Sequence, residues 1–150
     1  MSLDYPTLKA EVIESLENTQ LMILATCLNN KVTARNMAII NDELIIMFQT
    51  NGMSEKIQQI IANPNIALAT GNMQIEAAAH VSTIPEDNQR FLDRFKIKFP
   101  EYYEKYSGMT NEVIVICTPK RFAMYRFIDG KPCTNVLDVI KNSAYRLLLE

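Results

Sequence analysis

The chain has 150 residues, of which 48% are apolar, and its 15 basic and 17 acidic side chains leave a net charge of −2. Proteins that bind nucleic acid by general electrostatic attraction carry an excess of positive charge, so this balance argues against that class. No apolar run approaches the length of a membrane span, and we expect one domain over residues 1–150, located in the cytoplasm.

The first third of the chain predicts a helix followed by an antiparallel meander of strands. Apolar side chains repeat at helical spacing over residues 6–16, and Asn18-Thr19 ends this helix. Asn29-Asn30 suits the positive φ angles of a tight hairpin, and Asn41-Asp42 turns the chain again. The expected strands cover residues 21–28, 32–40 and 44–49.

The middle of the chain predicts a helix, a hairpin and a second helix. Residues 54–62 form the first helix, which ends at Asn63-Pro64 because the residue before a proline resists the helical conformation. Pro85 begins the longer helix, whose apolar stripe we interpret as core: Phe91, Leu92, Phe95 and Phe99. The hairpin between them covers residues 66–70 and 74–82, joined at Gly71-Asn72.

The last third predicts two more strands and a terminal helix. Thr118-Pro119-Lys120 separates strands over residues 113–117 and 121–127, and residues 136–149 form the helix. Seven or so short strands with two or three helices indicate a mainly β fold, a small antiparallel β-barrel with helices over its ends.

Two cations stand out on neighbouring elements of this predicted fold. Arg35 lies among largely apolar residues in the second strand. An unpaired guanidinium would be costly there, so we expect it to meet either a carboxylate or a bound phosphate. Ser54 and Lys56 lie at the start of a helix, where free backbone N–H groups and the helix dipole favour an anion. Together these residues suggest a phosphorylated ligand.

Other site chemistries find little support in the sequence. His80 is the only histidine, and Cys27, Cys117 and Cys133 are far apart, so we predict no metal site and reduced thiols. Four glycines in total leave little room for a glycine-rich phosphate loop. Gln74 begins a strand of small residues, which either packs under a helix or leaves room for a flat ligand or a partner chain.

Six segments occur in a characteristic order: Leu24-Ala25-Thr26, Arg35, Phe48-Gln49-Thr50, Ser54-Glu55-Lys56, Ile57-Gln58-Gln59-Ile60 and Asn63-Pro64. In this order they resemble the pyridoxamine 5'-phosphate oxidase-related superfamily of FMN-binding split barrels, one branch of which is the nitroimidazole-resistance proteins. The resemblance extends from about Leu21 to Gly130, and its middle third is the specific part.

The resemblance implies a split β-barrel that forms a homodimer, with FMN bound in two equivalent sites at the subunit interface. Arg35 and Lys56 would hold the phosphate, and the backbone of Asn36 and Met37 would run along the isoalloxazine ring. Gln74 matches a glutamine that contacts the flavin across the site. The implied cofactor site comprises Arg35, Asn36, Met37, Gln49, Thr50, Ser54, Lys56 and Gln74.

Two departures from the family pattern bear on function. Glu55 occupies a position that is often basic in the family, which removes one phosphate contact. The true oxidases carry a carboxy-terminal arginine and histidine that bind the phosphate of the vitamin substrate, and here Thr134 and Val136 stand in those places. We therefore predict no pyridoxamine 5'-phosphate oxidase activity.

The sequence favours an FMN-dependent oxidoreductase of unassigned small-molecule substrate, with a reduced nicotinamide as the expected electron donor. A reductase of nitro compounds is one specific version. The alternative is a non-catalytic or stress-related protein that stores or senses FMN, and a third interpretation replaces FMN with haem or a deazaflavin. His80 and Tyr125 are candidate proton donors, although a core or interface role is the stronger interpretation of both.

Overall fold

Nine strands and four helices make up the part of the chain that the computed structural model describes, residues 1–106 and 108–150. The helices are α1 (Tyr5–Glu17), α2 (Glu55–Ala62), α3 (Pro85–Lys98) and α4 (Pro100–Tyr106). The strands are β1 (Leu21–Leu28), β2 (Lys31–Ala38), β3 (Ile40–Asp42), β4 (Ile45–Asn51), β5 (Asn65–Thr70), β6 (Met73–Val81), β7 (Glu112–Ile128), β8 (Lys131–Asp138) and β9 (Ser143–Leu148). None of these helices is long and apolar enough to cross a membrane.

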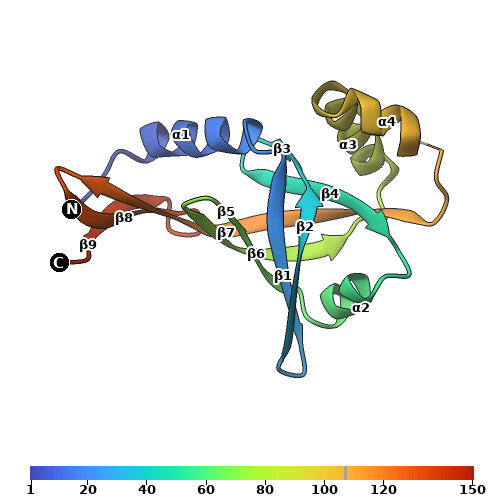
Figure 1. The fold of residues 1–150 in the computed structure, drawn as a ribbon, viewed down its shortest axis with the longest axis horizontal. Helices are drawn as coiled ribbons and strands as arrows, with labels where there is room; N and C mark the ends of the chain where they lie inside the picture. Colours follow the sequence, from blue (N-terminus) through green and yellow to red (C-terminus); the bar gives the residue numbers. More distant parts are fainter. Residues whose placement is uncertain (107) are drawn as a thin grey trace.

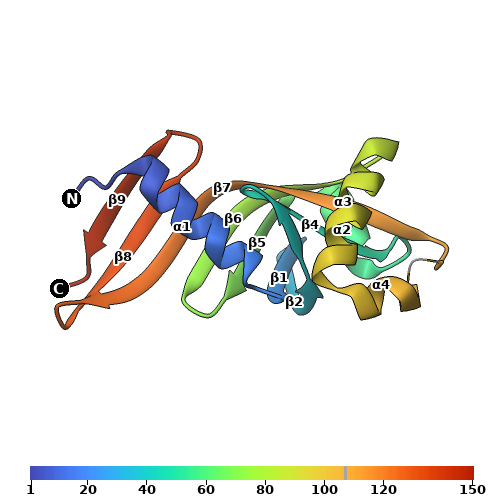
Figure 2. The ribbon, with the colours of Figure 1, turned by 90° about the horizontal axis from the view of Figure 1, so that it is seen from above.

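The strands form one antiparallel sheet that curls into a split β-barrel, as expected from the sequence (Figure 1). The barrel follows the order β2-β1-β5-β6-β7-β4-β3, and β8 and β9 continue the sheet from β7. The hairpin at Asn29-Asn30 is confirmed, since both residues have positive φ angles. α1 lies across β8 and β9 at one end of the molecule, while α3 and α4 lie at the other (Figure 2).

The second predicted strand, residues 32–40, is in fact divided. β2 pairs with β1 as far as Ala38, and β3 then pairs with β4 instead. The next turn lies at Glu43, which has a φ of 54°, rather than at Asn41-Asp42. Because of the break at Ile39, β2 pairs with β1 whereas β3 pairs with β4. This change of partner strand opens the barrel between β2 and β4.

The predicted loop at Thr118-Pro119-Lys120 is wrong, because β7 runs through it as one strand of 17 residues. Pro119 pairs with Ala77, where the register of β6 against β7 shifts between Glu76 and Ala77. A proline cannot donate to a sheet ladder, and an irregularity of this kind accommodates it without ending the strand. β7 therefore pairs with β4, β6 and β8 in turn.

The predicted helix over residues 136–149 is also wrong. Asp129 and Gly130, both with positive φ, form a tight turn that folds the chain back along β7 as β8. Asn142, with a φ of 50°, then lies at the turn that leads into β9. Pairing with β7 and cover from α1 outweigh the helix propensity of the leucines in this segment.

Two apolar cores result from this arrangement. The larger one fills the barrel and extends under α1 through Leu8, Val12 and Leu16. The smaller one lies between α3 and the outer face of β3, β4 and β7, where Phe91, Phe95 and Phe99 are buried. The aromatic stripe predicted to be core is therefore confirmed as core.

Candidate functional site

Arg35 projects from β2 into a network of neutral hydrogen-bond partners. Its guanidinium donates to the hydroxyl of Thr26 at 2.9 Å, to the hydroxyl of Thr33 at 2.5 Å and to the carbonyl of Leu24 at 3.2 Å. Both hydroxyls in turn donate to Oε1 of Gln59, at 2.5 Å from Thr26 and 3.1 Å from Thr33. Since every one of these acceptors is uncharged, the positive charge of Arg35 is held in place without being neutralised.

Lys56 lies in the first turn of α2, close to Arg35. Its Nζ donates to the hydroxyl of Thr50 at the end of β4, at 2.8 Å. Ser54 occupies the N-cap position, but its hydroxyl donates to the carbonyl of Asn51 instead of capping the helix. The first backbone N–H groups of α2 have no acceptor inside the helix, and this end of α2 suits an anion as the sequence suggested.

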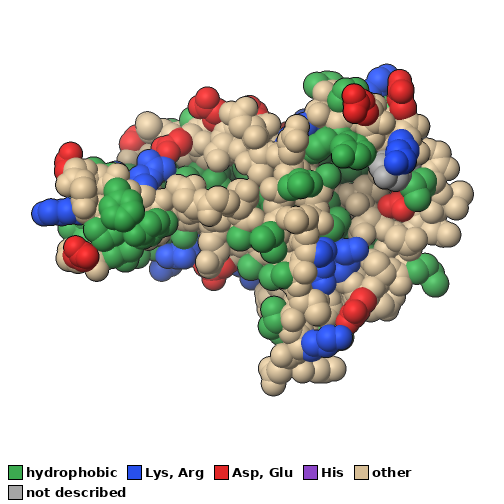
Figure 3. All heavy atoms as spheres, viewed as in Figure 1, with side chains coloured by type: hydrophobic (Ala, Val, Ile, Leu, Met, Phe, Trp, Pro, Cys, Tyr) green, Lys and Arg blue, Asp and Glu red, His purple; other side chains and the backbone are tan. Residues whose placement is uncertain are grey.

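The two cations affect each other electrostatically. Burial lowers the pKa of Arg35, and it also lowers the pKa of Lys56, which the neighbouring charge of Arg35 lowers further. Basic side chains gather on the surface between β2 and α2 (Figure 3). Two part-buried like charges held this close are unfavourable on their own, and an anion placed between them would relieve the repulsion.

Glu55 turns away from this pair toward the β1–β2 hairpin. Its carboxylate accepts from Lys31 at 2.9 Å, and both side chains are largely exposed to solvent. The charge of Glu55 still raises the pKa of Arg35, so it offsets part of the local positive charge. At position 55, which is often basic in the family, this chain thus has a negative charge that reduces the local positive potential.

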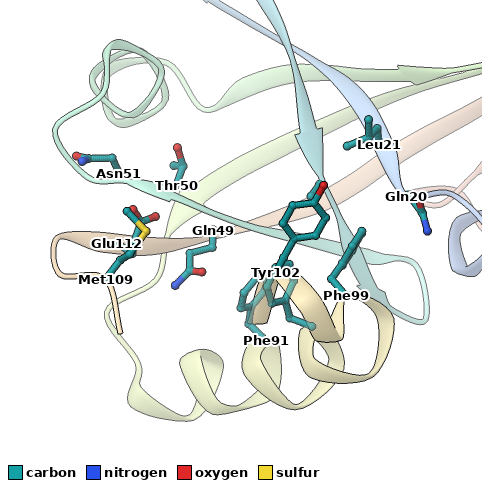
Figure 4. Close-up of a pocket in the computed structure, with 12 residues that line it drawn as sticks. Gln20, Leu21, Gln49, Thr50, Asn51, Phe91, Phe99, Tyr102, Met109 and Glu112 are labelled. Carbon is teal, nitrogen blue, oxygen red and sulfur yellow. The ribbon is translucent and has the colours of Figure 1, made fainter. Parts of the chain in front are cut away.

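A cavity of about 480 Å³ lies beside the cation pair, and we call it the aromatic cavity. It opens between β4 and the helices α3 and α4, with the start of β1 and the end of β2 at its other end (Figure 4). Thr50 lines the cavity and also accepts from Lys56, so the two features share a wall. Its described lining residues are Gln20, Leu21, Ala38, Gln49, Thr50, Asn51, Phe91, Phe95, Phe99, Tyr102, Met109 and Glu112.

The structure brings five of the eight predicted site residues into this region: Arg35, Thr50, Ser54 and Lys56 around the start of α2, and Gln49 in the aromatic cavity. Asn36 and Met37 lie next to Arg35 on β2, which pairs only with β1 and so leaves one backbone edge open. Gln74 is not brought close within one chain. It is separated from Asn36 by β1 and β5 in the cross-strand row Asn36, Ile23, Ala69, Gln74, roughly 14 Å at ordinary strand spacing.

Sequence reasoning missed the residues that position Arg35. Gln59 of α2 is only 3% exposed, whereas Ile61, an apolar residue of the same helix, is 67% exposed. The face of α2 that meets the sheet thus includes Gln59 and leaves Ile61 outside it. Thr26 and Thr33 form a cross-strand pair in phase with Arg35, and this alternation is the signal that identifies them.

The two candidate proton donors lie outside the region. His80 is exposed on β6, opposite Ile116 of β7. Tyr125 lies toward the other end of β7, where its ring meets Phe127 edge-on at 5.5 Å between centroids. Neither side chain is among the described residues that line the aromatic cavity.

Solved structures with the same fold come from several bacteria. General Stress Protein 26 from Bacillus anthracis is 22% identical, with a TM-score of 0.54, over 77% of this chain and 91% of that one. A nimC/nimA family protein from Clostridium acetobutylicum is 16% identical, with a TM-score of 0.60, over 93% of each chain. HutZ, the heme storage protein from Vibrio cholerae, is 12% identical, with a TM-score of 0.62, over 75% of this chain and 89% of that one.

These identities are low enough that the likeness establishes the fold alone. No curated protein matches the chain in sequence. The family model described as pyridoxamine 5'-phosphate oxidase, however, matches residues 8–126, which include both cations, the start of α2 and most of the barrel. The chain therefore belongs to the pyridoxamine 5'-phosphate oxidase family of split β-barrels.

Proposed function

We propose that this protein binds FMN through Arg35 and Lys56 and acts as an oxidoreductase on a small molecule. The observation that carries the proposal is the pair of part-buried cations that donate hydrogen bonds to neutral hydroxyls and a carbonyl. A phosphate monoester offers the two negative charges and the multiple acceptors that such a pair lacks. Thr50 and Ser54 lie within the same region and add hydroxyl groups to it.

The surroundings of the cation pair fit the remainder of FMN. The open edge of β2 presents the backbone N–H and C=O groups of Asn36 to the polar rim of a ring, while those of Met37 face β1. FMN, when bound, supplies two-electron redox chemistry, with a reduced nicotinamide as the proposed donor. The protein's own part is to hold the phosphate, orient the ring and limit access of water.

A homodimer is part of this proposal. The outward face of the sheet carries small side chains in adjacent cross-strand rows, with Ala25 paired to Ala67 and Ile23, which is 47% exposed, paired to Ala69. A flat face of small residues permits close approach of a second copy. Gln74 lies next to Ala69 in one such row, and a partner subunit on this face would bring its side chain toward the other subunit's flavin.

The vitamin oxidase activity itself is not proposed. Thr134 and Val136 of β8 carry no charge, and Val136 is fully buried. The substrate phosphate would therefore lack a cationic partner at those positions, a loss of roughly 2–3 kcal/mol for each charge-assisted hydrogen bond. We favour FMN over haem because the cation pair suits a phosphate and because His80 lies exposed outside the cavity lining.

The test is retention of FMN by purified protein through gel filtration, followed by its visible absorbance, in the native chain and in Arg35→Met and Lys56→Met. We expect the native protein to retain FMN and each variant to bind it at least about 30-fold more weakly. This is the effect of losing one charge-assisted hydrogen bond of about 2 kcal/mol. Arg126→Met is the matched control, because Arg126 pairs with Glu11 on α1, away from the site. Native protein that fails to retain FMN, or equal losses in all three variants, would refute the proposal.

A second experiment separates an enzyme from a protein that stores or senses FMN. Reduced nicotinamide is added to the FMN-loaded protein without oxygen, and the flavin absorbance is followed over time. Rapid bleaching supports the oxidoreductase. A flavin that stays oxidised for hours supports storage or sensing, while leaving the FMN site itself intact.

A further inference from the structure

We infer that the aromatic cavity is the substrate subsite of the proposed flavin reaction and that it takes a planar, uncharged aromatic compound. The inference rests on the proposed function, because it concerns the substrate of the FMN-dependent reaction. Its evidence is separate, however, and comes from the walls of the cavity, from the charges of α3 and from Glu112.

One wall of the cavity is formed by a row of aromatic rings, of which those of Phe91, Phe95 and Phe99 are largely buried and that of Tyr102 is 53% exposed. The rings of Phe91 and Phe95 stack with centroids 5.1 Å apart, and those of Phe95 and Phe99 lie 5.2 Å apart. Tyr102 of α4 extends this surface, with its ring edge-on to Phe99 at 6.1 Å, and stands in the space between Gln49 and Leu21 (Figure 4). Flat aromatic compounds pack well on such a wall through stacked and edge-on contacts.

α3 carries four cations, and none of them is among the described residues that line the cavity. Arg90 and Arg94 both pair with Asp42 of β3, at 3.6 and 3.0 Å. Lys96 lies over the ring of Tyr103 at 5.6 Å, and Lys98 is held by backbone carbonyls, with its Nζ 5.7 Å from the centroid of the Phe99 ring. Helix α3 therefore contributes aromatic side chains to the cavity lining and keeps its cations engaged with other groups of the protein.

Among the described residues that line the cavity, Glu112 is the single charged one. It is the first residue of β7, paired with Asn51, and its charge partly opposes the lowering of the Lys56 pKa by burial and by Arg35. A carboxylate here opposes a second anion beside the phosphate site. Gln49 supplies a neutral amide that can donate to a carbonyl or nitro oxygen or accept from a hydroxyl.

The size and position of the cavity fit a small molecule beside a cofactor. Its volume of about 480 Å³ lies within the range of roughly 300–1,000 Å³ that is usual for small-molecule sites. Thr50 joins it to the cation pair, so a compound in the cavity would lie next to a ligand whose phosphate is held by Lys56. The anion site thus selects a negatively charged group, and the aromatic cavity beside it selects a neutral one.

The test uses two compounds that differ in charge but share one ring system: naphthalene-1-methanol, which is neutral, and 1-naphthoate, which is an anion at neutral pH. Binding to FMN-loaded protein is measured by calorimetry after FMN saturation has been established by titration. We expect naphthalene-1-methanol to bind at least tenfold more tightly than 1-naphthoate. Glu112→Gln should reduce this preference to threefold or less.

The location of the compound is checked with two matched aromatic deletions. Tyr102→Ala should weaken binding of the alcohol at least fivefold, because Tyr102 forms part of the wall and, at 53% exposure, can be replaced without opening the core. Phe127→Ala removes a ring that is 64% exposed on β7 and should have no effect. Thermal melts of both variants verify that each is folded.

Several results would overturn the inference. Equal binding of the two compounds, no change in Tyr102→Ala, or release of the alcohol when FMN is added would each show that the cavity is not a neutral subsite beside the flavin. If the FMN titration saturates and the alcohol does not bind, the subsite fails while the FMN site stands. If FMN itself does not bind, the proposed function fails, and the substrate role of the cavity fails with it.

Discussion

Arg35 is fixed in position before any ligand arrives. Thr26 and Thr33 each accept a hydrogen bond from the guanidinium and each donate one to Oε1 of the buried Gln59, so the side chain of Arg35 is held in one orientation. A phosphate that meets Arg35 need not order a long flexible side chain, and this saving favours binding. Gln59 therefore acts as a positioning residue, although it lies on the far side of the threonines.

Glu55 allows a test of charge near this site. We expect Glu55→Gln to tighten FMN binding about twofold at low ionic strength, because it removes a negative charge that is exposed and partly screened. The measurement is an FMN titration in dilute buffer and again in concentrated salt. The gain should disappear in salt, and a gain that persists would point to a structural effect of the substitution.

The residue types of the site were predictable, but their supporting contacts were not. Arg35 in an apolar strand and Lys56 in a helix start stand out in sequence, because burial and chain position limit what a cation can do there. The role of Gln59 depends on which face of α2 meets the sheet, and the role of Glu112 depends on the pairing of β7 with β4. Both roles are determined by contacts between segments that are distant in the chain, and the local periodicity of the sequence does not indicate such contacts.

At the scale of elements, Lys98 connects three segments that are far apart in the chain. Its Nζ donates to the carbonyls of Leu16 at 3.3 Å, of Thr19, and of Ile39 at 3.0 Å. It thereby ties the end of α3 to the end of α1 and to the break between β2 and β3. Burial lowers the pKa of Lys98 to about 8, so this connection carries a desolvation cost while the amine is charged.

The stability contributed by Lys98 should therefore depend on pH. Below pH 8 the amine is protonated in both the folded and the unfolded chain, and its contribution is constant. Between pH 8 and its ordinary value of 10.5, the unfolded chain holds more protons, so the free energy of unfolding rises with pH. Comparing urea unfolding of the native chain and Lys98→Met at pH 7 and pH 9.5 checks this. We expect the variant to be less stable by about 1–2 kcal/mol at pH 7 and by more at pH 9.5, and a difference that shrinks at the higher pH would contradict the assignment.

The elements themselves were predicted best where a local signal was strong. The Asn29-Asn30 hairpin and the Asn63-Pro64 helix end follow from turn chemistry and lie where expected. Asp129-Gly130 is an equally strong hairpin signal, yet the leucines that follow it favour a helix when read alone. The segment forms β8 and β9 rather than a helix because these strands complete the surface on which α1 packs. The residues of α1 lie more than a hundred positions earlier in the chain.

At the scale of the whole molecule, we propose that the site is complete only in a dimer. Asn36 and Gln74 lie in one cross-strand row of the sheet, with β1 and β5 between them. One chain cannot bring both to the same flavin edge without a change of fold. Two copies packed against this part of the sheet could do so, and each would then depend on its partner for cofactor binding.

Ala69→Arg places a long charged side chain in the middle of this row. We expect a protein that sediments as a monomer and loses FMN, while circular dichroism shows an unchanged β content. Ile97→Arg is the control, because Ile97 is 83% exposed on α3, and it should remain a dimer with bound FMN. If Ala69→Arg remains dimeric and keeps FMN, the interface lies on another surface.

The packing of α1 against β8 and β9 has a consequence during synthesis. The apolar face of α1, formed by Leu8, Val12 and Leu16, leaves the ribosome well before the strands that cover it have been made. α1 also contacts β3, which is made early, so until β8 and β9 emerge the apolar face of the helix is only partly covered. The packing of α1 is therefore completed late in synthesis, after the hairpin at Asp129-Gly130 has closed and β9 has been made.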